Sequence, residues 1–230
     1  MNQSIDVLDH GSVRLVDHMG DDLSIVRSAR VSYNAEWRSG EDAGKDEKLI
    51  DYLLSNHHTS PFEAVTFTFD VKAPIFVFRQ WHRHRTWSYN EVSARYSELP
   101  EEFYIPKPEH IGVQSTDNKQ MREFVRQSHD SVDALIEAMT DHNKKAFELY
   151  RDLLDNAVPR ELARSVLPVA TYSHMFASVD LHNLFHFLRL RLHEHAQYEI
   201  RVYAEAMLQL IEPIVPVSVA AFRKHMLGDQ

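Results

Sequence analysis

Residues 64–96 read A-V-T-F-T-F-D-V-K-A-P-I-F-V-F-R-Q-W-H-R-H-R-T-W-S-Y-N-E-V-S-A-R-Y and contain the clearest strand of the chain. Up to residue 71, apolar side chains alternate with Thr66, Thr68 and Asp70, which predicts a strand with one buried and one polar face. Pro74 is suited to the first position of a helix, and apolar residues continue to Trp81. We therefore expect a strand that leads directly into a helix.

That helix ends in a cluster of cations, although the chain has a formal net charge of −9. The cluster contains Arg79, Arg83, Arg85, Arg95, His82 and His84. Cations at the end of a helix offset its dipole, and the planar guanidinium group suits capture of phosphate. The aromatic residues Trp81, Trp87 and Tyr89 can stack on a planar ligand. The stretch predicts an anion site beside a planar ligand; a basic surface loop is the alternative.

Composition limits the class of protein. The 230 residues, 43% hydrophobic and 26% charged, fit one globular domain. No long apolar run and no secretory signal are evident, so we expect a cytoplasmic protein without a membrane span. The absence of cysteine excludes disulfides and a cysteine nucleophile. The acidic balance argues against general nucleic-acid binding.

The rest of the chain predicts alternating strands and helices. Strands are expected at residues 4–9, 12–17 and 169–179, with an extended piece at 103–105. Helices are expected at residues 22–34 (capped by Asp22), 45–56, 121–156 with a possible break at 140–143, a short one after 158–159, and 181–212 (capped by Asp180 and stopped by Pro213). We expect an α+β domain over residues 1–230, with a central mixed or antiparallel sheet flanked by helices and a long C-terminal helix.

The expected last helix is rich in histidine. His182 and His186 are spaced i, i+4, as are Arg191 and His195, and such a histidine pair can bind zinc. The catalytic zinc motif needs a glutamate base and a third ligand, whereas Asn183 stands inside this pair. We expect no metal site. A histidine-based metal hydrolase and a single-stranded nucleic-acid module, stacking bases on Trp81, Trp87 and Tyr89, are the alternative functions.

The spacing of the cationic stretch is more specific than its composition. Arg83-His84-Arg85, followed after seven residues by Ser93, resembles the signature of the flavin-dependent thymidylate synthases. Residues 15–33, 58–63, 158–168 and the expected last helix also resemble blocks of that family, and only residues 112–156 are unspecific. The resemblance implies reductive methylation of dUMP to dTMP, with 5,10-methylenetetrahydrofolate as carbon donor, NADPH as reductant and FAD as hydride source. It also implies a homotetramer whose sites are built from several subunits.

The resemblance implies roles for individual residues. Those against FAD are Ser60, Arg83, His84, Arg85, Glu91, Asp180, His182 and His186, with His58 close by. Those that hold dUMP are Gln80, Trp81, His82, Arg83, Glu91, Val92, Ser93, Ala94, Arg95, Arg164 and Arg191. Family members often carry asparagine at the position of Asp180 and arginine at that of His182, which affects the flavin contacts.

Two of these residues are expected to be catalytic. The resemblance implies that Arg191 binds the uracil and favours ionisation at its N3, and a fixed guanidinium group stabilises developing negative charge. Ser93 occupies the position of the family's active-site serine, and we assign it to positioning the nucleotide rather than to covalent attack. Its alternative role is that of a turn or capping serine.

Overall fold

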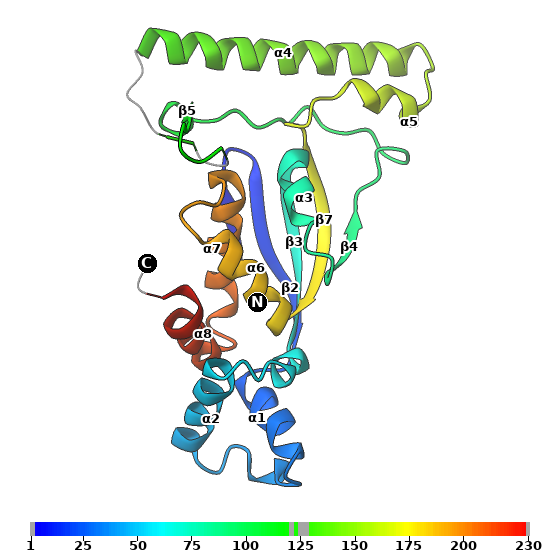
Figure 1. Ribbon diagram of the computed structural model, residues 1–230. Coiled ribbons are helices and arrows are strands. Elements are labelled where there is room, and N and C mark those ends of the chain that lie inside the picture. Colours follow the sequence, from blue (N-terminus) through cyan, green and yellow to red (C-terminus); the bar gives the residue numbers. More distant parts are fainter. Residues whose placement is uncertain (1–2, 120–121, 124–128, 229–230) are drawn as a thin grey trace.

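The computed structural model describes residues 3–119, 122–123 and 129–228. Its centre is a five-stranded antiparallel sheet in the order β1-β2-β3-β7-β4 (Figure 1). The strands are β1 (Ser4–Val7), β2 (Gly11–Met19), β3 (Thr66–Pro74), β7 (Tyr172–Asp180) and β4 (Ser88–Glu91). β3 and β7 pair along their whole length, so the sheet joins segments that are about a hundred residues apart in the sequence. The expected mixed or antiparallel sheet is antiparallel throughout.

Helices lie on one side of this sheet and beyond its ends (Figure 1). They are α1 (Asp22–Val31), α2 (Ala43–Ser55), α3 (Ile75–Trp81), α4 (His129–Asp155), α5 (Arg160–Ala163), α6 (Leu181–Arg191), α7 (Tyr198–Ile211) and α8 (Pro216–Phe222). Short helical turns are η1 (Glu36–Arg38), η2 (Ser60–Ala64), η3 (Pro108–His110), η4 (Arg164–Val166) and η5 (Arg223–Leu227), and β5 (Val113–Gln114) pairs with β6 (Arg122–Glu123). In Figure 1, α4 lies across one end of the molecule, and α1 and α2 form the opposite end. None of the described helices is long and apolar enough to cross a membrane.

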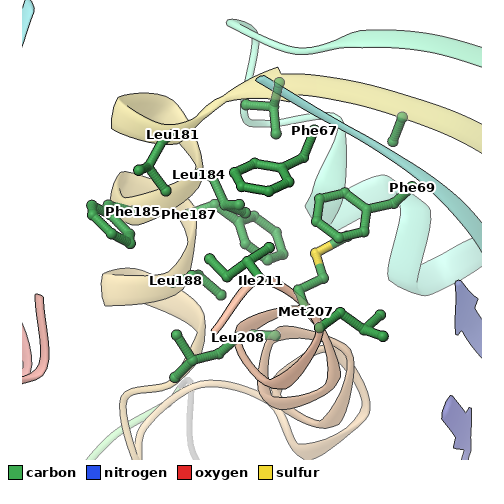
Figure 2. Close-up of a cluster of buried hydrophobic side chains, with 14 of the residues drawn as sticks. Phe67, Phe69, Leu181, Leu184, Phe185, Phe187, Leu188, Met207, Leu208 and Ile211 are labelled. Carbon is green, nitrogen blue, oxygen red and sulfur yellow. The ribbon is translucent and has the colours of Figure 1, made fainter. Parts of the chain in front are cut away.

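The core lies between the sheet and the pair α6 and α7. The expected alternation of β3 is confirmed, because Phe67, Phe69 and Val71 are buried while the intervening side chains are only partly covered. Figure 2 shows the two phenylalanines facing apolar side chains of α6 and α7. Burial of each large apolar side chain stabilises the fold by about 1.5–3 kcal/mol. The core therefore holds α6 firmly against the sheet.

The expected long C-terminal helix is wrong. The chain forms α6 and α7 as two helices, separated by residues 192–197. The segment H-E-H-A-Q at 193–197 contains no large apolar side chain that could hold a continuous helix on the core. Instead the chain turns, and α7 packs against α6 and β2. His195 consequently does not share a helix face with Arg191.

Three other expectations need correction. Asp21, rather than Asp22, caps α1 in a capping box with Ser24, while the Asp22 carboxylate accepts hydrogen bonds from the backbone of Val217 and Ser218 at the start of α8. The helix expected over 121–156 begins at residue 129, and 122–123 form β6; its expected start at residue 121 lies outside the described residues. α4 has no break at 140–143.

Strand β4 and helix α8 were not expected from the sequence.

Gly11 is required by a close approach between β2 and α7. A Cβ atom there would lie 2.1 Å from the hydroxyl oxygen of Tyr203 and 2.7 Å from the carbonyl oxygen of Val7. The Tyr203 hydroxyl donates to the Lys72 carbonyl of β3 at 2.8 Å and is held in place. We expect Gly11→Ala to lower the free energy of unfolding by about 2–4 kcal/mol. Urea denaturation measures this change.

Gly44→Ala is the matched control, because a Cβ there meets only the Asp42 carboxylate oxygen at 3.6 Å. Alanine is also a better helix former than glycine in α2. This variant should be as stable as the unaltered protein or slightly more stable. Equal stability of both variants would show that the contact between β2 and α7 is loose.

Candidate functional site

Arg191, His84 and Gln80 meet at the C-terminal end of α6. The Nε of Arg191 donates to Nε2 of His84 at 3.2 Å, and its Nη2 lies 3.4 Å from the backbone carbonyl oxygen of Gln80. The ring of His186 lies on the same side, 6.1 Å from that of His84. The structure thus brings together four of the residues expected from the sequence, from α3, the turn after it and α6.

The turn after α3 is anchored by aromatic residues. The hydroxyl group of Tyr89 donates to the carbonyl oxygen of His84 at 2.9 Å and also lies 3.2 Å from that of Trp81. The Trp81 ring is fully buried, stacks on Phe187 with centroids 4.9 Å apart and meets the buried Trp87 edge-on. The expectation that Trp81 and Trp87 stack on a ligand is therefore wrong. A contact of Trp81 with the nucleotide would have to involve its backbone.

Burial controls the charges in this cluster. It lowers the pKa of His84 to about 4, with the Arg191 and His186 charges acting in the same direction. His84 is therefore neutral near pH 7, and the hydrogen bond from Arg191 requires that its Nε2 carry the lone pair. Burial also lowers the pKa of Arg191, which still remains a cation at neutral pH because guanidinium groups titrate at very high pH. Both acceptors of Arg191 are uncharged, so its positive charge is available to a ligand.

A second group of expected residues follows β4. The carboxylate of Glu91 accepts a hydrogen bond from Ser173 at 2.6 Å. Arg95 forms an ion pair with Glu161 at 3.1 Å, and Nε of Arg164 donates to the carbonyl oxygen of the same Glu161 at 3.3 Å. Glu161 thus brings the two arginines near each other.

Three neighbours of this group are also expected site residues. The Oγ of Ser93 accepts from the backbone N–H of Arg95 at 3.3 Å, which is the turn role considered as its alternative. Val92 is exposed, and Ala94 is buried. Within the described residues of the single chain, Ser93 therefore has a structural hydrogen bond in the turn that carries Arg95.

A third group surrounds the N-terminal end of α6. Ser60 begins η2, which contacts α6, and both Ser60 and His58 are exposed. The Asp180 carboxylate caps α6 by accepting from the backbone and the side chain of Asn183 at 2.9 Å and 2.6 Å, as expected for the cap. His182, in the first turn of α6, is half-buried. The polar side chains at this end of α6 are therefore at or near the surface.

Two of the three groups lie at opposite ends of α6 in the single chain. The two ends of the eleven-residue helix α6 are about 16 Å apart at the usual rise per residue. Arg83 and Arg85, in the turn after α3, are exposed, and His82 packs edge-on against Tyr89. A cavity of about 350 Å³ lies instead between β1, residues 104–110 and α7, and none of the expected site residues is among those that line it.

The structure bears on the two alternative functions. Within the described part of the chain, no three histidine, aspartate or glutamate side chains are grouped so that they could hold a metal ion. Burial of Trp81 and Trp87 removes two of the three rings on which a single-stranded nucleic acid would stack. Neither alternative gains support from the fold.

Sequence reasoning missed a polar network behind Gln80. Nε2 of Gln80 donates to Oε1 of Gln197 at 2.5 Å, and Nε2 of Gln197 donates to Glu199 at 2.8 Å. Glu199 is only 2% exposed, which is unusual for a glutamate. The only signal in the sequence was a carboxylate at a core position on the apolar face of the helix, and the expected continuous helix obscured it.

The neutral state of His84 makes stability depend on pH. Its pKa of about 4 in the fold is below its ordinary value of 6.5, so the unfolded chain binds the proton more readily. The free energy of unfolding is therefore unaffected by protonation of His84 above about pH 6.5 and falls as the pH is lowered toward about 4. The loss is about 1–2 kcal/mol after allowing for partial solvent screening. We expect His84→Gln to lose less stability than the unaltered protein between neutral pH and pH 5. Urea denaturation at several pH values measures this, and equal pH dependence of the two proteins would contradict it.

Comparison with known proteins identifies relatives of this chain. The family model described as "Thymidylate synthase complementing protein" matches residues 14–217. A flavin-dependent thymidylate synthase of Treponema denticola is 49% identical over 98% of this chain and 84% of its own length, and one of Thermus thermophilus is 50% identical over 97% and 80%. The crystal structure of a UMP/dUMP methylase, PolB from Streptomyces cacaoi bound with 5-Br dUMP, has a TM-score of 0.86 at 37% identity, covering 98% of this chain and 100% of that one.

Proposed function

Because this chain belongs to the family of flavin-dependent thymidylate synthases, we propose that it converts dUMP to dTMP, with 5,10-methylenetetrahydrofolate as carbon donor and NADPH as reductant of FAD. FAD, when bound, supplies the hydride that this chemistry requires. The chain has no cysteine that could activate the uracil ring by covalent attack. The proposed reaction therefore depends on binding and electrostatics supplied by the residues of the site.

The availability of the Arg191 charge is the observation that supports this function best. Its guanidinium group is half-buried, held by the neutral His84 ring and by the Gln80 carbonyl oxygen. A cation fixed in this way needs little reorganisation when a ligand arrives, and it stabilises negative charge that develops on a uracil ring. We assign Arg191 to the uracil and Arg95 and Arg164 to the phosphate of dUMP, since paired arginines suit a phosphate dianion.

The residues proposed to bind FAD have suitable chemistry. Arg83 and Arg85 are exposed cations for a pyrophosphate, and Ser60 offers a hydroxyl group at the surface. His182 and His186 lie one turn apart on α6, where their rings can contact a flavin or an adenine. The Asp180 carboxylate already accepts two hydrogen bonds from Asn183, so we propose that it supports the helix end and that Asn183 lies beside the cofactor.

The separation of the three groups supports shared sites. We propose a homotetramer in which Arg95 and Arg164 of one subunit complete a site with Arg191 of another, with the whole chain acting as one domain in the cytoplasm. The exposed apolar side chains Leu162 and Val169, at 61% each, lie near Arg164 in the sequence and are suited to burial between subunits. Sedimentation analysis tests the assembly independently of activity.

The visible absorption spectrum of purified protein, after incubation with FAD and desalting, tests the cofactor. Retained flavin bands that bleach with NADPH and recover in air support the proposal. Both dUMP and UMP should be offered as substrates, because a UMP/dUMP methylase is among the similar structures. A protein that holds no FAD at micromolar concentration would contradict the proposed function.

Arg191→Ala should lower kcat/KM for dUMP by about 10²–10³-fold while FAD still binds, because the lost charge acts on the nucleotide. Steady-state kinetics and the flavin absorbance per protein chain measure the two effects. Arg189→Ala, an exposed arginine on the same helix, is the matched control and should retain activity. Unchanged dTMP formation in Arg191→Ala would refute the assigned role.

Ser93→Ala should weaken dUMP binding or turnover by about tenfold without abolishing the reaction, since we assign no covalent step to the hydroxyl group. Titration with dUMP and a product assay separate binding from turnover. Complete loss of turnover with unaltered dUMP affinity would instead indicate a nucleophilic serine.

A further inference from the structure

We propose that Glu199 and Gln197 are positioning residues for the nucleotide, because together they determine which end of the Gln80 amide faces the ligand. This inference rests on the proposed function and extends it to two residues of α7 and its start. A glutamine amide can present either an oxygen or an NH₂ group to a ligand. The hydrogen bonds behind Gln80 remove that choice.

The network begins at a buried carboxylate. Nη2 of Arg122 lies 3.0 Å from each oxygen of Glu199, and the Tyr104 hydroxyl donates to Oε1 at 3.1 Å. Burial, with the Glu199 charge acting in the same direction, raises the pKa of Tyr104, so the phenol keeps its proton and acts as a donor. Arg122 provides the charge that a buried glutamate needs. Glu199 is therefore a fixed acceptor at 2% exposure.

The direction of every following hydrogen bond results from this anchor. A carboxylate only accepts, so Gln197 must turn its NH₂ group toward Glu199, at 2.8 Å. Its carbonyl oxygen then faces Gln80 and accepts from Nε2 of Gln80 at 2.5 Å. One N–H of the Gln80 amide is thereby engaged by Gln197, which fixes Nε2 on that side. The Oε1 of Gln80 is consequently turned away from Gln197, and it can only accept.

The position of Gln80 shows what this acceptor can do. Its backbone carbonyl oxygen lies 3.4 Å from the guanidinium of Arg191. The Gln80 side chain starts from the same residue, so we infer that a ligand held by Arg191 also contacts its Oε1 and meets a cationic donor beside a neutral acceptor. A nucleotide offers a matching donor beside an acceptor, either at the imide edge of the uracil or at a sugar hydroxyl. The network therefore favours binding of a hydrogen-bond donor of dUMP. A freely rotating Gln80 amide would discriminate less between a donor and an acceptor at this position.

A purely structural role for the network makes a different prediction. Gln197 precedes α7, yet its side chain makes no capping hydrogen bond to that helix, and it is only partly buried. Its two side-chain hydrogen bonds, to Gln80 and Glu199, are the ones described above. Loss of the Gln197 amide should consequently affect the Gln80 orientation more than the stability of the helix.

The test is a double-mutant cycle on the FAD-loaded protein. Gln197→Met retains the length of the side chain and should weaken dUMP binding about tenfold, with unchanged flavin content and a similar melting temperature. Gln80→Ala should weaken it at least as much. The double variant should bind dUMP no more weakly than Gln80→Ala alone, because Gln197 acts only through Gln80. Glu205→Gln, an exposed carboxylate on α7 outside the network, should bind dUMP as the unaltered protein does.

Different outcomes refute different claims. Equal dUMP affinity of the unaltered protein and Gln197→Met, or effects of the two single substitutions that simply multiply, would overturn the positioning role. A Gln197→Met protein that melts far lower and loses its FAD would show that the network is structural instead. An unaltered protein that holds FAD but does not bind dUMP would refute the proposed function itself, and these results are distinguishable in one set of titrations.

Discussion

The hydrogen bond from Arg191 to a neutral His84 is the interaction on which the proposed site depends. A guanidinium group that is half out of water is costly unless its donors are satisfied. Satisfying them with a carboxylate would cancel the charge that a ligand needs. The structure engages two of its five N–H donors with an imidazole nitrogen and a backbone carbonyl oxygen instead. Burial keeps His84 uncharged, so the cation is held in place without being neutralised.

The Arg191–His84 pair keeps its geometry only if α6 and the turn after α3 are held rigidly. The core fastens α6 to β3 and α7 through Phe187 and its neighbours (Figure 2). The same Phe187 stacks on Trp81 at the end of α3, and Tyr89 of β4 holds the carbonyl oxygen of His84. The aromatic residues of the cationic stretch therefore support the site from behind. Their contribution to ligand binding is geometric, since they set the positions of the cations.

The sequence predicted the parts of the fold that depend on local patterns. Alternation along β3, the Asp180 cap and the first two strands were all predicted, because side-chain period and caps are set by neighbouring residues. The break between α6 and α7 was missed because the apolar period resumes after it. Strand β4 was missed because its pairing partner, β7, is more than eighty residues away.

The same distinction applies to the site. The motif from Arg83 to Ser93 identified the family, yet it could not show that Trp81 is buried or that Ser93 bonds within its own turn. The role of Glu199 was not predicted from the sequence, since a glutamate on a helix usually faces water. Its function depends on Arg122 and Tyr104, which are distant in the chain and meet it only in the folded protein.

The most direct test of the account is a single turnover without oxygen. Protein loaded with FAD and reduced by NADPH is mixed with dUMP and 5,10-methylenetetrahydrofolate, and flavin absorbance and products are followed together. The account predicts that the flavin is reoxidised as dTMP appears, in equal amounts, and that neither occurs when dUMP is omitted. A flavin that stays reduced while dUMP remains unmethylated would contradict it.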